Sequence, residues 1–294
     1  METATPSRTW RILELIHWTT DYLKDKGFPT PKTDVEWLLT AVLHCSRMQL
    51  YTDFEKPLTP AELLQFKGLL KERLTHKPVQ YLIGETDFMG LTFQLNEQVL
   101  IPRPETELLV EEAVEYLRKC PEEQQRVLDI GTGSGCIAVS IAALVPRVRV
   151  WGIDNSESAL DVANSNAGLH HVTEQVIFRN LDILSDDPPD IPFPLIVSNP
   201  PYISPDDFER IQKDVREFEP REALVAEENG LRYYKHFARH AQNWLIAGGR
   251  LMLEIGGTHQ AQSINDIFTE AGWEHVTIRP DYNGQDRILS AISK

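Results

Sequence analysis

The chain has 294 residues, and its 41% hydrophobic and 25% charged residues are ordinary proportions for a globular protein. Its 44 acidic residues outnumber its 29 basic ones, and all of the excess follows residue 80. Because an acidic surface repels phosphate backbones, a nucleic-acid partner is not expected. No apolar run could span a bilayer, no signal-peptide pattern opens the chain and the three cysteines are isolated, so a cytoplasmic protein without a membrane partner is expected.

The first part of the chain, residues 1–78, predicts a small all-helical domain. Apolar side chains recur at helical spacing, and a first helix is expected to end before Gly27. A second helix is expected to begin near Asp34, and a third begins with Thr59 as its cap and Pro60 in its first turn.

Residues 79–106 predict a β-hairpin connector. The alternating Leu91, Phe93 and Leu95 indicate strands, and Asn96-Glu97 indicates a turn. Prolines flank Arg103 in the sequence Ile101-Pro102-Arg103-Pro104, and they restrict the backbone there. The segment is therefore interpreted as a short, stiff link between two domains.

The third part, residues 107–294, predicts an α/β domain. Strands are expected at 126–130, 148–153, 174–180, 193–198, 249–255, 275–280 and 286–292, and helices at 105–119, 135–144, 156–168, 230–246 and 258–271. This alternation is typical of a mostly parallel sheet, here of seven strands, with helices on both faces. The last two strands have no helix between them, so one of them is expected to run antiparallel at that edge.

A glycine-rich loop follows the first of these strands and precedes a helix. It reads Asp129-Ile130-Gly131-Thr132-Gly133-Ser134-Gly135, where glycines permit a sharp turn and the helix start offers free N–H groups. Asp154 ends the next strand and can accept hydrogen bonds from ribose hydroxyls. Asp182 follows the third strand, where it can bind an adenine amino group while Ile183 packs on the ring.

The loop departs from the dinucleotide-binding pattern, because Cys136 stands where the last glycine or alanine would be. It resembles the nucleoside-binding loop of class I methyltransferases. That resemblance implies a Rossmann-like fold and S-adenosyl-L-methionine as cofactor, with S-adenosyl-L-homocysteine as product. The expected cofactor-binding residues are Asp129, Gly131, Thr132, Gly133, Ser134, Gly135, Asp154, Asp182, Ile183 and Asn199.

The sequence Asn199-Pro200-Pro201-Tyr202 follows another buried strand, at the end of the sheet where open α/β folds bind ligands. It suits a planar nitrogen, either a carboxamide or the amino group of a base, whose lone pair is delocalised. The side-chain carbonyl of Asn199 can accept one N–H and the backbone carbonyl of Pro200 the other, while Tyr202 lies against the planar group. These three residues are the expected catalytic residues. Positioning and desolvation suffice for such a transfer, and no metal is expected.

Motifs outside these loops extend the resemblance to known methyltransferases over residues 78–294. They are Pro78-Val79-Gln80-Tyr81-Leu82-Ile83-Gly84, Phe88-Met89-Gly90, Ile101-Pro102-Arg103-Pro104-Glu105-Thr106-Glu107, Phe218-Glu219-Pro220-Arg221-Glu222-Ala223-Leu224, Asn229-Gly230-Leu231, Leu253-Glu254-Ile255-Gly256 and Gly284-Gln285-Asp286-Arg287. Together they resemble the PrmC/HemK family, the protein-glutamine N5-methyltransferases of peptide-chain release factors. One departure is Ala226-Glu227-Glu228-Asn229-Gly230, which stands where the family has a glycine-rich turn.

The resemblance implies that the target is the glutamine of the Gly-Gly-Gln tip in class I release factors. The substrate-binding residues that it implies are Asn199, Pro200, Pro201, Tyr202, Leu100 and Arg103. The helical N-terminal domain is interpreted as a substrate-recognition arm, and a monomer is expected. Two alternatives remain open: the same chemistry on a ribosomal-protein glutamine or a base amino group, and a non-enzymatic cofactor-binding scaffold.

Overall fold

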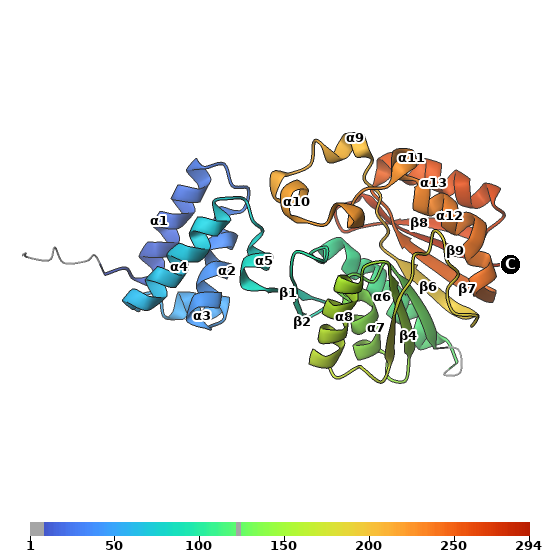
Figure 1. Ribbon diagram of the computed structural model, residues 1–294, viewed down its shortest axis with the longest axis horizontal. Helices are drawn as coiled ribbons and strands as arrows, with labels where there is room; N and C mark the ends of the chain where they lie inside the picture. Colours follow the sequence, from blue (N-terminus) through green and yellow to red (C-terminus); the bar gives the residue numbers. More distant parts are fainter. Residues whose placement is uncertain (1–8, 122–124) are drawn as a thin grey trace, which may run out of the picture. The chain divides into compact units, whose positions relative to one another are not determined.

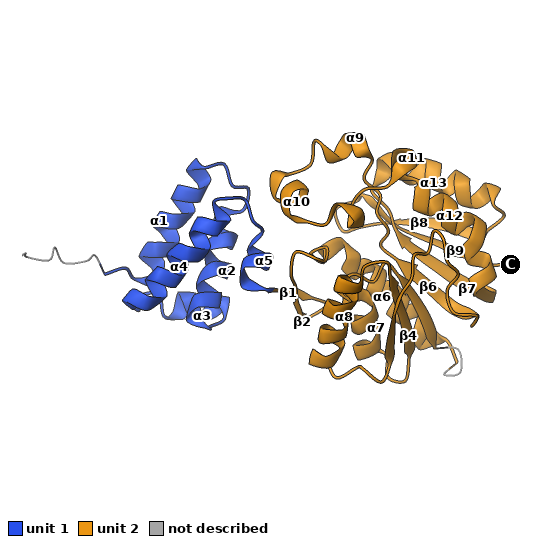
Figure 2. Ribbon diagram, viewed as in Figure 1, with its two compact units in different colours: residues 1–84 blue, residues 85–294 orange. Residues whose placement is uncertain are grey.

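The computed structural model describes residues 9–121 and 125–294, and the chain divides into two compact units, residues 1–84 and 85–294 (Figures 1 and 2). The boundary follows a short helix, α5 (Val79–Ile83), which ends at Gly84 in the left-handed conformation (φ 80°). Glycine adopts this conformation without steric cost and commonly ends helices. Over the described ranges, no helix is long and apolar enough to cross a membrane.

The first unit is helical, as predicted. Besides α5, its helices are α1 (Ile12–Asp25), α2 (Pro31–Leu43), α3 (Arg47–Thr52) and α4 (Pro60–Arg73). The side chain of Thr59 accepts a hydrogen bond from the N–H of Glu62, and Pro60 occupies the first turn, as the sequence indicates. A buried ion pair joins two helices of the unit, with Arg73 Nε 2.8 Å from a carboxylate oxygen of Asp34.

The second unit begins with a β-hairpin of β1 (Glu85–Phe88) and β2 (Leu91–Gln94). The chain reverses at Met89-Gly90, and both residues have positive φ, which suits a two-residue hairpin turn. The turn predicted at Asn96 also exists, since the N–H of Val99 donates to the Asn96 carbonyl at 3.3 Å. It lies after the hairpin rather than within it.

A seven-stranded sheet forms the centre of the second unit, as predicted. Its strands are β3 (Arg126–Ile130), β4 (Arg149–Asp154), β5 (Val176–Asn180), β6 (Phe193–Ser198), β7 (Leu245–Glu254), β8 (Glu274–Pro280) and β9 (Asp286–Ile292). In space they run in the order β5-β4-β3-β6-β7-β9-β8, and the pairs from β5 to β7 are parallel. The antiparallel strand is β9, which lies between β7 and β8 and therefore one place in from the predicted edge.

Helices cover both faces of the sheet (Figure 1). The covering helices are α6 (Pro104–Lys119), α7 (Cys136–Leu144), α8 (Glu157–Leu169), α12 (Arg232–His240) and α13 (Thr258–Glu270). The first three share one hydrophobic core with Val127 and Val197, and the last two share another with Leu128 and Ile196. Neighbouring residues of one strand thus point to opposite faces, as a doubly covered sheet requires.

The helix predicted at 230–246 is shorter than expected. After α12 the chain forms a 3-10 turn (Ala241–Trp244), and β7 begins at Leu245 rather than near residue 249. The preceding segment, residues 199–231, crosses the carboxyl ends of the strands in short elements that the sequence did not indicate. These elements are α9 (Pro205–Phe208), α10 (Lys213–Phe218), a 3-10 turn (Arg221–Ala223) and α11 (Glu227–Gly230).

Candidate active site

The glycine-rich loop is tied to the end of the neighbouring strand. One carboxylate oxygen of Asp154 accepts the N–H of Gly133 at 2.9 Å, and the other accepts the N–H of Ser156 at 3.0 Å. Burial raises the pKa of Asp154, although both N–H groups favour its ionised form. Because each carboxylate oxygen has a second lone pair, Asp154 can hold the loop and still accept ribose hydroxyls.

Four of the expected cofactor residues lie behind the loop rather than on its open side. Thr132 donates its hydroxyl to Asp129 at 2.6 Å, and Thr132, Asp129 and Ser134 are all buried. Burial raises the pKa of Asp129 to about 7. Gly135 has φ 78°, and a Cβ there would lie 3.0 Å from the Cβ of Ala163, so glycine lets α8 pack closely. These residues shape the loop but do not line the cavity.

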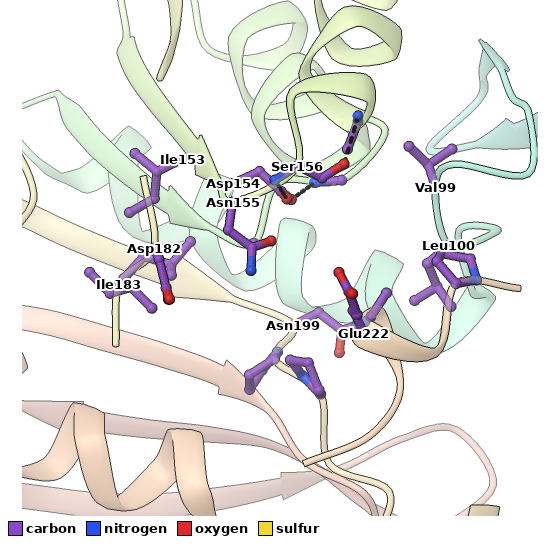
Figure 3. Close-up of a pocket in the computed structure, with 18 of the residues that line it drawn as sticks. Val99, Leu100, Ile153, Asp154, Asn155, Ser156, Asp182, Ile183, Asn199 and Glu222 are labelled. Carbon is purple, nitrogen blue, oxygen red and sulfur yellow. Dashed lines mark hydrogen bonds between the residues drawn. The ribbon is translucent and has the colours of Figure 1, made fainter. Parts of the chain in front are cut away.

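A cavity opens at the carboxyl ends of β3, β4 and β6. The predicted site residues that line it are Gly131, Gly133, Asp154, Asp182, Ile183, Asn199, Pro200, Pro201 and Leu100. Asp182 and Ile183 lie on one side of the cavity and Leu100 on the opposite side, with Asn199 and Glu222 between them (Figure 3). The cavity can therefore hold an elongated ligand, with one end beside Asp182 and the other beside Asn199.

Asn199 follows β6 directly and is held from behind by α6. Its side-chain Nδ2 donates to the hydroxyl of Thr106 at 3.1 Å, and Thr106 in turn donates to Glu254 Oε2 at 2.6 Å. The hydroxyl of Ser198 donates to the Ile130 carbonyl at 2.6 Å, which joins the ends of β6 and β3. The position of Asn199 is thus fixed by both the sheet and a buried polar network.

Tyr202 does not line the cavity with the rest of its motif. Its hydroxyl donates to Glu254 Oε1 at 3.4 Å, and burial raises its pKa. Its backbone carbonyl accepts the side-chain amide of Gln260 at 3.0 Å. A Cβ on residue 230 would lie 2.1 Å from that same carbonyl, so only glycine fits at this position without displacing Tyr202.

Arg103 also does not line the cavity, and it pairs instead with the buried carboxylate of Glu219. Its guanidinium lies 2.6 Å from Glu219 Oε1, and the other Glu219 oxygen accepts the N–H of Ile101 at 3.2 Å. Burial raises the pKa of Glu219, while Arg103 opposes that rise. The pair holds residues 99–103, which include Leu100 of the cavity wall, against the segment that follows α10.

Several residues of the site were not identified individually from the sequence. Thr106, Glu219, Glu222 and Glu254 lie in motifs noted only for their family resemblance, and Tyr233 of the cavity wall lies in no motif. Thr106 and Glu254 are 148 positions apart, and only the fold brings them together. Glu254 could have been identified as a candidate site residue because it is an acid at the end of an apolar strand.

A glycine loop after β3, an acid ending β4 and an Asn-Pro-Pro-Tyr motif after β6 together define a class I methyltransferase. Family models describe residues 14–84 as a PrmC N-terminal domain and residues 105–215 as a methyltransferase small domain. The release factor glutamine methyltransferase of Geobacter sulfurreducens is 42% identical, with 95% of this chain and 96% of that protein aligned. That of Chlorobaculum tepidum is 41% identical over 98% and 99% of the two chains. The chain therefore belongs to the release factor glutamine methyltransferase family.

The fold has wider relatives among solved structures. The catalytic domain of human METTL16, in complex with an RNA hairpin, aligns with a TM-score of 0.56, covering 76% of this chain and 80% of that one. At 13% sequence identity, this likeness concerns the fold alone.

The cavity suits S-adenosylmethionine, the cofactor of this class. Asp154, Asp182 and Glu222 line it, and among the described residues no lysine or arginine does. A dinucleotide would bring phosphates to a wall of carboxylates, whereas S-adenosylmethionine has a ribose, an adenine and a cationic sulfonium. Apolar side chains that can flank an adenine, including Ile153 and Ile183, line the same cavity.

Glu222 is expected to favour the cofactor over its product. S-adenosylmethionine has one more positive charge than S-adenosylhomocysteine, and Glu222 extends its carboxylate into the cavity (Figure 3). Because Glu222 is exposed, we expect Glu222→Gln to weaken S-adenosylmethionine binding by only about two- to fivefold at low salt. Titration calorimetry should find the affinity for the product unchanged. An equal loss for both ligands would contradict this electrostatic role.

Proposed function

We propose that this protein transfers the methyl group of S-adenosylmethionine to the side-chain amide nitrogen of the Gly-Gly-Gln glutamine in class I release factors. The observation that carries the proposal is Asn199, which lines the cavity while its amino group is engaged with Thr106. Its carbonyl oxygen is the acceptor of this side chain and can accept an amide N–H. The names of the relatives support a release-factor glutamine, and the motif resemblance supports the Gly-Gly-Gln tip.

In this proposal the protein acts by orienting and desolvating the amide. Asn199 accepts one N–H of the glutamine, and the Pro200 carbonyl accepts the other, so that the nitrogen faces the methyl group. The bound cofactor supplies an electrophilic methyl on its sulfonium. As the nitrogen accepts the methyl group it gains positive charge, and both carbonyl oxygens bind its hydrogens more strongly, which stabilises the transition state. One of its two hydrogens then leaves as a proton to solvent, so that the methylated amide is neutral. Pro201 stiffens the loop, and Tyr202 anchors it through Glu254.

The remaining residue assignments follow from where each group lies. Gly131 and Gly133 of the loop, together with Asp154 and Asp182, are proposed to contact the cofactor. The remaining loop residues are proposed to support the loop from behind, and they are Asp129, Thr132, Ser134 and Gly135. Leu100 is proposed to border the substrate. Arg103 is proposed to act on the substrate through the segment that it fixes, because its guanidinium pairs with Glu219.

The first unit is proposed to recognise the release factor, with residues 1–78 as the recognition domain, 79–106 as connector and 107–294 as the catalytic domain. Exposed large apolar side chains concentrate in this unit, and they are Trp18, Met48, Tyr51, Phe54 and Leu64. Surfaces that bind other proteins are enriched in aromatic residues and methionine. Contacts far from the glutamine would help to position it for transfer.

We further propose that a protein rather than a nucleic acid is the substrate, because the chain is acidic and its cavity wall has acidic but no basic side chains among the described residues. We also propose that the protein acts as a monomer. Since release factors act on ribosomes, the reaction is proposed to take place in the cytoplasm.

A substrate panel tests this proposal. Purified protein would be incubated with labelled S-adenosylmethionine and, separately, with a class I release factor, ribosomal proteins, DNA and RNA. Label in the release factor alone is the expected result. Label in ribosomal proteins or nucleic acid, with none in the release factor, would replace the proposed substrate by one of the alternatives. Bound cofactor without label in any sample would favour a scaffold.

A further inference from the structure

A buried chain of hydrogen bonds lies behind Asn199. Thr106, in the first turn of α6, is 2% exposed, and Glu254, at the end of β7, is 1% exposed. Asn199 Nδ2 donates to the Thr106 oxygen at 3.1 Å, and the Thr106 hydroxyl donates to Glu254 Oε2 at 2.6 Å. Three segments far apart in the sequence thus meet in one line that ends at the cavity wall.

The direction of these hydrogen bonds follows from the chemistry of Glu254. An ionised carboxylate only accepts hydrogen bonds, so Thr106 must give its single hydrogen to Glu254. The Thr106 oxygen can then only accept from Asn199, which must turn its amino group inward. The carbonyl oxygen of Asn199 is left for the cavity. An amide in the opposite orientation would present N–H groups to the N–H groups of the substrate.

We propose that Thr106 and Glu254 are positioning residues that fix Asn199 in the amide orientation able to accept the N–H of the substrate glutamine. This inference rests on the proposed role of Asn199. It assigns a function to a buried acid that does not line the cavity. Tyr202 adds to the same device, since its hydroxyl donates to the second oxygen of Glu254 at 3.4 Å.

The orientation of Asn199 should depend on pH. Burial raises the pKa of Glu254 to about 7, opposed by the Thr106 hydrogen bond and Arg287, and Glu105 adds to the rise. Tyr202 donates to the side chain of Glu254, and Tyr234 donates to its backbone carbonyl at 2.9 Å. Once protonated, Glu254 can donate to Thr106, whose hydrogen can then turn toward Asn199 and permit the wrong orientation. Activity should therefore be present above this pKa and fall as pH decreases through it.

The test compares Thr106→Val, which removes the hydroxyl at nearly constant volume, with Thr106→Ser, which keeps it. We expect Thr106→Val to lower kcat about tenfold, because it loses the one hydrogen bond that orients Asn199. The kcat of Thr106→Ser should stay near that of the wild type. Cofactor affinity and KM should change little in both variants. The kcat of the wild type should fall below about pH 7. The pH profile of Thr106→Val should show no such inflection.

A second variant keeps the proposal testable if Thr106→Val does not fold. Glu254→Gln retains the shape of the side chain but cannot ionise, so its kcat should show no inflection near neutral pH. Wild-type kcat and an unchanged inflection in Thr106→Val, or the same inflection in Glu254→Gln, would overturn the proposed positioning. Asn199→Ala distinguishes failure of this inference from failure of the proposed function. If Asn199→Ala is active, the proposed site is wrong. If Asn199→Ala is inactive while the Thr106 and Glu254 variants keep wild-type kcat, only the positioning by Thr106 and Glu254 is wrong.

Discussion

Replacing Asn199 with alanine should lower kcat by about 10²- to 10³-fold, the usual effect of removing one hydrogen-bonding group aimed at developing transition-state charge. The variant loses the acceptor for one substrate N–H and releases Thr106 from its partner. Because Asn199 forms only part of the cavity wall, cofactor affinity should fall far less than kcat. Single-turnover methyl transfer and calorimetry on the same preparation would measure the two effects.

The matched control is Asn164→Ala, the same chemical change on the exposed side of α8. Among the residues that the structure describes, Asn164 hydrogen-bonds only within its helix, to the Leu160 carbonyl. Its replacement should leave kcat unchanged. A proportional loss of kcat and cofactor affinity in Asn199→Ala would indicate a binding role and contradict the proposed acceptance of the substrate amide.

Replacing Gly230 with alanine should destabilise the second unit by about 2–4 kcal/mol and also impair catalysis. Two costs combine: the left-handed φ of 81° is unfavourable for a residue with a Cβ, and that Cβ would lie 2.1 Å from the Tyr202 carbonyl and 2.6 Å from Gln260 Nε2. Either the carbonyl or α11 must move, and Tyr202 belongs to the reaction motif. Denaturant unfolding and kcat would report the two consequences.

Gly168 provides the control, because it lies within α8 and an added Cβ there would meet nothing within 4 Å. Gly168→Ala should stabilise the unit by about 0.5–1 kcal/mol through a lower entropy cost of helix formation. A Gly230→Ala variant as stable and as active as Gly168→Ala would show that α11 and Tyr202 separate without cost, against the close packing that the structure shows.

The sheet and its covering helices could be predicted because their signals are local. The run from Val127 to Ile130 is apolar enough to predict a buried strand, and the glycines after it mark the turn. The position of β9 could not be predicted, because strand order depends on pairing between distant segments and not on the pattern within either strand. The segment 199–231 was missed because its helices, such as α9 (Pro205–Phe208), are too short to show periodicity.

The site divides in the same way. Asp154 and Asn199 were predicted as site residues because their chemistry and their place at the end of a strand are visible together, and both line the cavity. Thr106 and Glu254 were not, since neither has a neighbouring partner in the sequence and their contact depends on the packing of α6 against the sheet. The segment ending at Gly230 shows a further limit: Glu228 and Asn229 adopt the left-handed conformation that a glycine-rich turn would adopt more easily.

The most direct test of the proposed function is transfer of a labelled methyl group to a class I release factor, compared with the same factor carrying a replaced Gly-Gly-Gln glutamine. Label on the intact factor alone is the predicted result, and it would place the reaction on that one amide nitrogen. Equal label on both factors, or none on either when cofactor binding is confirmed, would contradict the account.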